Sequence, residues 1–195
     1  RGDAIFWMIA TSMRKKCGFT EREIKHRKKE IKKVTNRFDF DNVYELGLPT
    51  TRLDTLPIAE IIEKIKKIVI TVKPDVIYLP FAQDVHSDHR IIFEAAHSCT
   101  KAFRFPFIKQ VLMMETVSET DFVPAIRECA FIPNYFVNIA DFIDKKVEIM
   151  KIYKSELQTP PFPRTLENIT ALAKYRGSMA GFEFAESFSI LKFRW

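Results

Sequence analysis

The feature that most constrains the fold is a repeated alternation between short apolar runs and longer amphipathic segments. Residues 4–10 are continuously apolar, and residues 75–79 form a second short run that is apolar after Asp75. Between them, residues 58–72 place isoleucine and valine at helical spacing. Short apolar runs are typical of strands buried on both faces, which occur in parallel sheets covered by helices. The order therefore predicts an α/β fold with a mainly parallel sheet.

Local signals place several elements along the chain. Thr20 and Glu23 have the spacing of a capping box, which predicts a helix from there to about Asn36. Residues 187–193 alternate apolar and polar side chains and predict an edge strand. Further strands are expected near 43–46, 111–115 and 135–139, and further helices near 89–103, 141–156 and 164–177.

Size and composition indicate an ordinary globular protein. With 195 residues, of which 47% are hydrophobic and 29% charged, residues 1–195 are expected to form a single domain. The three cysteines fit no metal or redox motif and suggest reduced thiols in a cytoplasmic setting. The sequence contains no apolar run long enough for a membrane span. Nothing in it predicts an oligomeric state.

The net charge of +6 is concentrated between Arg14 and Arg37, where lysine and arginine greatly outnumber acids. Such a patch can attract anions or nucleic acid, or it can be the solvated face of a helix. We favour the solvated face and expect no nucleic-acid partner. Aromatic residues do not alternate with the basic ones, so a stacking platform for single strands is not indicated.

The segment after residues 75–79 carries the best candidate site. His86 and His89 lie three residues apart, with Asp84 and Asp88 beside them. In open α/β sheets, ligands gather beyond the carboxyl ends of strands, where this segment lies. Neutral imidazole is a common zinc ligand, and a nearby carboxylate can fix its tautomer. The alternative is that Asp84 and Ser87 only cap the next helix, with both histidines partly exposed.

This segment also resembles a known family. Pro80 and residues 84–90 are similar to the second signature of the PIG-L family, the LmbE-like zinc-dependent N-acetylglucosaminyl deacetylases. Supporting similarities extend along the chain. They are Gly2-Asp3 before the first strand, Arg27 to Glu30 as an RxxE motif, Leu46 to Pro49, Tyr153 to Glu156, and Arg176-Gly177 with Ala185 to Phe188.

The resemblance implies a Rossmann-like three-layer α/β/α sandwich and a role for each residue of the motif. His89 would ligate zinc, and His86 would stabilise the oxyanion and protonate the leaving amine. Asp88 would orient His86, while Arg27 would help to hold the substrate. The expected reaction is zinc-dependent removal of an N-acetyl group. The expected partner is an amino-sugar-containing small molecule or glycolipid.

One part of the family pattern is missing. The first signature, a His-Pro-Asp-Asp run after the first strand, supplies the other two zinc ligands and the general base, and no segment here replaces it. Either about 20–30 further residues precede Arg1 in the intact protein, or the chain is a degenerate relative. We favour the first explanation. Loss of a central strand would expose apolar faces and could exceed a domain's stability of roughly 5–15 kcal/mol.

Two functions from other classes remain open. A non-catalytic protein on the same scaffold could bind a glycan or nucleotide-sugar, with Arg27 and Arg52 as anchors. A nucleic-acid-binding domain is the third hypothesis, and it rests on the charge between Arg14 and Arg37 alone.

Overall fold

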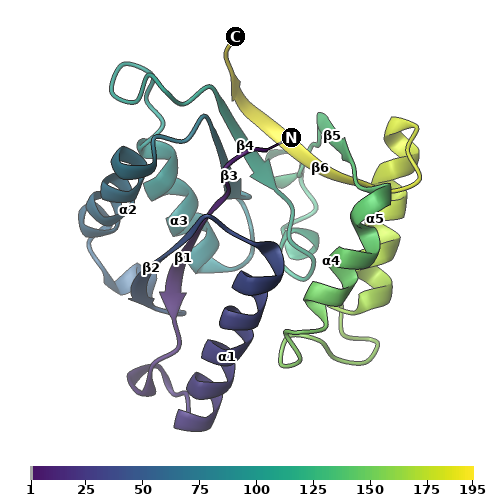
Figure 1. The fold of residues 1–195 in the computed structure, drawn as a ribbon, viewed down its shortest axis with the longest axis horizontal. Helices are drawn as coiled ribbons and strands as arrows, with labels where there is room; N and C mark the ends of the chain where they lie inside the picture. Colours follow the sequence, from purple (N-terminus) through teal and green to yellow (C-terminus); the bar gives the residue numbers. More distant parts are fainter. Residues whose placement is uncertain (1) are drawn as a thin grey trace. The chain divides into compact units, whose positions relative to one another are not determined.

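The computed structural model describes residues 2–195, and the chain divides into two compact units. Unit 1 comprises Arg1–Asp75 and Ser87–Ile108, and unit 2 comprises Val76–His86 and Lys109–Trp195. The principal elements of unit 1 are β1 (Phe6–Ser12), α1 (Glu21–Phe38), β2 (Asn42–Pro49), α2 (Ile58–Val72) and α3 (Ser87–Ser98) (Figure 1). Those of unit 2 are β3 (Val76–Pro80), β4 (Gln110–Met114), β5 (Tyr135–Asn138), α4 (Ile143–Met150), α5 (Leu166–Ala180) and β6 (Ala185–Phe193).

In unit 1, β1 and β2 pair in parallel, and α1 is the crossover between them. The predicted capping box is present: the Glu23 side chain accepts the Thr20 N–H, and the Thr20 hydroxyl accepts the Glu23 N–H. The helix ends where Asp39 adopts a left-handed conformation with φ 60°. The prediction of this helix is therefore confirmed, with its end two residues beyond the expected Asn36.

The helices α2 and α3 pack against each other in unit 1. Ile61 and Ile65 of α2 are fully buried, as is Ala95 of α3. The expected range of 89–103 for α3 was wrong at both ends, since this helix spans Ser87–Ser98. Its last turn closes with shorter-range backbone hydrogen bonds, in which the N–H groups of Cys99 and Thr100 donate to carbonyls three residues back.

In unit 2, the described residues form a four-stranded sheet with the order β3-β4-β6-β5. The strands β3 and β4 are parallel, whereas β6 is antiparallel to both β4 and β5. The prediction of an edge strand at 187–193 was therefore wrong, because β6 has a partner on each side. Ser187 and Phe188 are neighbours in this strand and both are buried, so side chains on both faces of β6 are covered. Alternation of apolar and polar residues therefore does not report the position of a strand in a sheet.

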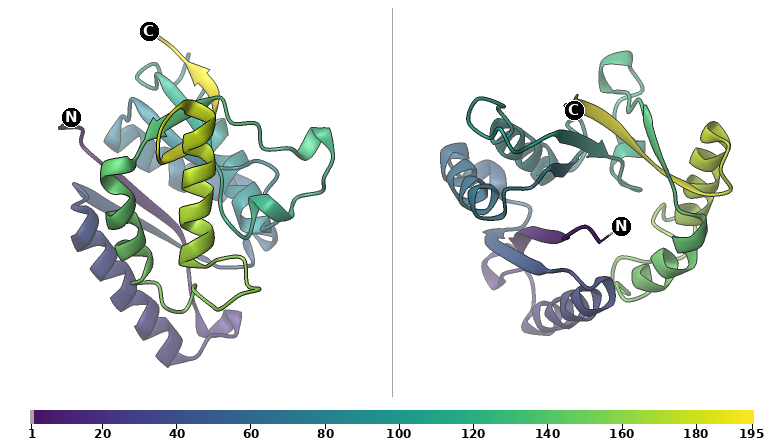
Figure 2. Two further views of the ribbon diagram at one scale, coloured as in Figure 1. Left: turned by 90° about the vertical axis from the view of Figure 1, so that its right-hand side faces the viewer. Right: turned by 45° about the horizontal axis from the view of Figure 1, so that its top comes forward.

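The helices α4 and α5 lie side by side in unit 2 (Figure 2). Helix α4 is shorter than the expected 141–156, because residues 140–142 form a 3₁₀ turn and the helix ends at Met150. Ile143 of α4, Ala173 of α5 and the nearby Ile139 form a small buried cluster. Among residues 2–195, no helix is long and apolar enough to cross a membrane, and Cys17, Cys99 and Cys129 are free thiols.

Candidate functional site

The loop that follows β3 is held by a buried carboxylate. Asp84 is fully buried, and the hydroxyl of Thr120 donates a hydrogen bond to its Oδ1 at 2.6 Å. The next residue is held as well, because the Val85 N–H donates to the Glu119 carbonyl at 3.4 Å. Burial of a charge is costly unless hydrogen bonds compensate for it, so these contacts stabilise one conformation of the loop. His86 follows directly and is half-buried.

Asp88 and His89 lie in the first turn of α3, in unit 1. Asp88 is 4% exposed, and its two carboxylate oxygens accept the backbone N–H groups of Thr51 at 2.6 Å and Leu53 at 3.3 Å. Asp88 therefore fixes the loop after β2 to the start of α3. The orientation of His86 by Asp88 stays a prediction. His89 is half-buried.

Arg27, the predicted substrate-binding residue, lies on α1 with its side chain 16% exposed. Its NH1 atom is 3.4 Å from Oε2 of Glu30, and His26 Nε2 is 3.0 Å from Oε1 of the same carboxylate. Glu30 is only 3% exposed. The RxxE motif thus places a buried carboxylate within reach of two basic side chains of the same helix, and this arrangement restricts the position of Arg27.

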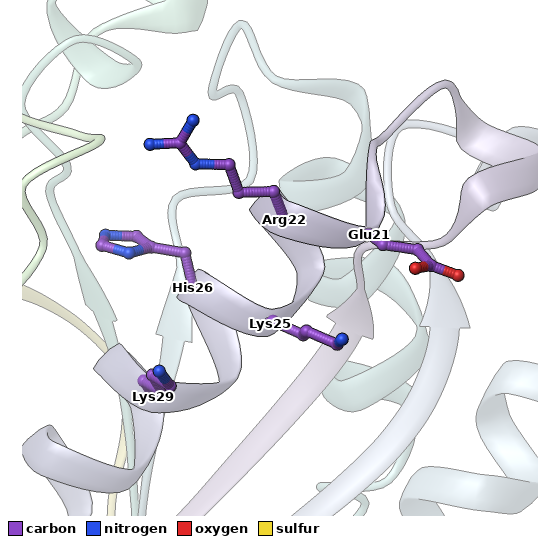
Figure 3. Close-up of a pocket in the computed structure, with 5 residues that line it drawn as sticks. All are labelled: Glu21, Arg22, Lys25, His26 and Lys29. Carbon is purple, nitrogen blue, oxygen red and sulfur yellow. The ribbon is translucent and has the colours of Figure 1, made fainter.

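A pocket on α1 is lined by Glu21, Arg22, Lys25, His26 and Lys29. Figure 3 shows Arg22 and His26 pointing to one side of the helix, and Glu21 and Lys25 pointing to the other. All five residues are exposed. Exposure is expected both of a solvated helix face and of an anion-binding patch, so the solvated face that we favoured stays a prediction. Arg27 is not among the lining residues.

The described residues of the candidate site do not provide a complete set of metal ligands. Among residues 2–195, no group of three or more His, Cys, Asp or Glu side chains is arranged to hold a metal ion. A catalytic zinc needs about three protein ligands together with water. The described residues therefore do not fit a zinc ion by themselves, and His89 stays a predicted single ligand.

Sequence reasoning missed two polar networks in unit 2. Arg164 contacts Ser118, Glu119 and Glu156, and no motif pointed to this arginine. In the second network, the guanidinium of Arg176 donates to both oxygens of Glu115 at 2.9 and 2.7 Å. The Ser187 hydroxyl also donates to Glu115, at 2.6 Å. Arg176 and Ser187 lie in the two C-terminal segments that resemble the PIG-L family. Their hydrogen bonds to Glu115 connect α5 and β6 to the residue that follows β4.

Comparison with solved structures shows the fold. The conserved protein TT1542 from Thermus thermophilus is 23% identical with a TM-score of 0.71, over 96% of this chain and 83% of that one. The N,N'-diacetylchitobiose deacetylase from Pyrococcus horikoshii is 17% identical with a TM-score of 0.71, over 97% and 73%. GalB, the 4-carboxy-2-hydroxymuconate hydratase from Pseudomonas putida, is 13% identical with a TM-score of 0.70, over 98% of both chains.

These likenesses confirm the prediction of a Rossmann-like α/β fold. They also show that this fold occurs in enzymes with different reactions, because one of the similar structures is a hydratase and another is a deacetylase. The family model described as PIG-L, GlcNAc-PI de-N-acetylase, matches residues 4–100, a stretch that contains Arg27, His86, Asp88 and His89. The chain therefore carries a PIG-L family domain over residues 4–100.

Proposed function

We propose that this chain acts in the hydrolytic removal of an N-acetyl group from an N-acetylglucosamine-type amino sugar or its conjugate. One observation carries the proposal: His86 follows a loop anchored by the buried Asp84, and Asp88 and His89 open the next helix, all inside the PIG-L match. The activity by which the family is described, de-N-acetylation, supports the same reaction class. We propose that residues 1–195 serve this reaction as one domain.

The chemistry assigns a distinct task to each residue. In amide hydrolysis a water oxygen bonds to the acyl carbon, the carbon–nitrogen bond breaks, and the amine leaves with a proton. We propose that His86, in its protonated form, hydrogen-bonds the developing oxyanion and passes its proton to the amine nitrogen. Asp88 would orient the His86 imidazole, and Arg27 would bind the sugar or its substituent. The products are acetate and a free amino sugar.

The proposal that the reaction depends on zinc rests on His89 alone, which we propose as a zinc ligand. Because the described residues do not complete a metal site, we assign no step of the reaction to zinc. Ligands from outside residues 2–195 would have to join His89 before a zinc ion could be held. The predicted cytoplasmic location likewise stays a prediction.

A second function is supported by the same observation on metal ligands. If His89 remains the single ligand, the protein would bind a glycan or nucleotide-sugar without hydrolysing it, with Arg27 and Arg52 as anchors. The nucleic-acid hypothesis still rests on the charge between Arg14 and Arg37 alone.

The deciding experiment uses protein expressed from its natural reading frame. Zinc per chain is measured by mass spectrometry, and acetate release is measured over a panel of N-acetylglucosamine conjugates. The proposal expects bound zinc, acetate release, and loss of that release in the H86A variant. H97A is the matched control, because His97 is an exposed residue of α3 stacked on Phe93.

Two outcomes separate the hypotheses. Zinc-loaded protein that releases no acetate from any conjugate would contradict the deacetylase proposal. Protein that binds a conjugate in calorimetry, with neither zinc nor acetate release, would support the non-catalytic alternative.

A further inference from the structure

The residues before His86 are held by a turn that is distant from them in sequence. This turn comprises Ser118, Glu119 and Thr120, and it contacts both Asp84 and Val85. The Glu119 and Thr120 N–H groups donate to the Thr116 carbonyl at 3.1 and 2.9 Å, which closes the turn on itself. A shift of the turn would therefore be transmitted to the backbone immediately before His86.

The contact between Thr120 and Asp84 is the buried part of this link. Thr120 is 7% exposed, and Asp84 is fully buried. The Thr120 hydroxyl donates its single proton to Asp84 Oδ1 at 2.6 Å and accepts the Thr116 N–H at 2.8 Å. Both capacities of the hydroxyl are used, so valine, which has the same shape, would remove two hydrogen bonds without opening a cavity.

Arg164 fixes the other end of the turn. Its NH2 atom is 2.5 Å from the Ser118 hydroxyl and 3.2 Å from Glu119 Oε1, and its NH1 atom pairs with Glu156. Ser118 has a positive φ of 79°, a conformation that serine seldom adopts without support. The Arg164 side chain is 21% exposed, so its ion pairs are only partly screened by water.

We propose that Arg164 and Thr120 are positioning residues for His86. Arg164 holds the Ser118–Thr120 turn, the turn holds Asp84 and Val85, and these two residues set the backbone from which the His86 side chain projects. Neither residue is required to touch the substrate. The catalytic consequence rests on the proposed function, whereas the structural link to His86 stands on the contacts alone.

The experiment compares three variants in the protein from its natural reading frame. Thr120→Val removes the hydroxyl, Arg164→Met removes the guanidinium, and Thr120→Ser restores the hydroxyl. The matched control is Thr170→Val, because Thr170 also lies in unit 2 and its hydroxyl donates one hydrogen bond to the Leu166 carbonyl at 2.9 Å. Amide hydrogen exchange at Val85 and the ¹⁵N resonances of the His86 ring are the primary readouts.

The proposal expects Val85 exchange to rise by about tenfold in T120V and in R164M, the size of one lost hydrogen bond. The His86 resonances should shift in both variants, while T120S and T170V resemble the parent protein. In the active enzyme, kcat should fall by about tenfold with KM unchanged, because positioning of the proton donor acts on the chemical step. T120V provides the test if R164M does not fold.

Unchanged Val85 exchange and unchanged His86 resonances in both T120V and R164M would overturn the proposal. Shifts of the same size throughout unit 2, without any preference for Val85 and His86, would overturn it as well, since they would indicate a purely structural role. If the parent protein releases no acetate, the proposed deacetylation fails, but the exchange and resonance data still decide whether the turn positions His86.

Discussion

The carboxylate of Asp88 accepts the backbone N–H of Thr51 at 2.6 Å, across 37 residues of sequence. Thr51 has a positive φ of 59°, and the same carboxylate also accepts the Leu53 N–H. Leu53 is fully buried, so this carboxylate anchors a core residue as well as a strained turn. Asp88 therefore has a structural task in unit 1 beside the catalytic one proposed for it.

Replacement of Asp88 should destabilise unit 1. In D88N the side chain keeps its size but loses a charged acceptor for one of the two N–H groups, at a cost of about 1.5–3 kcal/mol. Urea unfolding followed by circular dichroism measures this change. E94Q is the matched control, because Glu94 is an exposed carboxylate on the same helix. Equal stability of D88N and E94Q would contradict an anchoring role.

The capping box of α1 should give stability a dependence on acid pH. Hydrogen bonds from the Thr20 side chain and backbone lower the pKa of Glu23. A carboxyl group with a lowered pKa stabilises the folded state above its unfolded pKa of about 4.3 and loses that effect as pH falls through the folded pKa. Thermal melts of the parent and E23Q proteins should therefore differ at pH 6 and converge towards pH 3. A constant difference over this range would argue against the assignment.

Local signals explain which parts of the fold could be predicted. The start of α1 was predictable because a capping box is contained within four residues. The position of β6 between two other strands was not, because strand order depends on pairing with Gln110–Met114 and Tyr135–Asn138, which are distant in sequence. Alternation along one strand carries no information about its neighbours.

Some residues of the candidate site could be predicted from the sequence, and others could not. Residues 84–89 form a contiguous motif, so the sequence alone was sufficient to select them. The sequence did not predict the roles of Thr120 and Arg164, because both depend on contacts between distant residues. Thr120 bonds to Asp84, 36 residues away, and Arg164 bonds to Ser118, 46 residues away. Hydrogen bonds of this kind leave no periodic or spacing signal in one sequence.

The three free thiols should differ in reactivity. Cys99 is 1% exposed, and burial raises the pKa of its thiol, whereas Cys17 and Cys129 are half-buried. Only the thiolate reacts quickly, so alkylation of Cys99 by iodoacetamide at pH 8 should be at least about tenfold slower than that of the other two. Peptide mass spectrometry after timed alkylation measures each rate. The difference should disappear in urea, and a difference that persisted there would mean that burial is not its cause.

Substitution of Gly177 by alanine should lower the stability of the protein, although alanine is usually the better residue inside a helix. A Cβ atom at this residue would lie 2.7 Å from the backbone oxygens of Phe182 and Glu183, and backbone atoms cannot move aside as the end of a side chain can. Alanine normally favours a helix by about 1 kcal/mol relative to glycine. Here the clash should reverse the sign, so that G177A loses about 1–3 kcal/mol. S178A is the control at the next, exposed position, and its melting temperature should match that of the parent. A G177A protein as stable as S178A would mean that α5 and the turn at Phe182 are packed less closely than the structure shows.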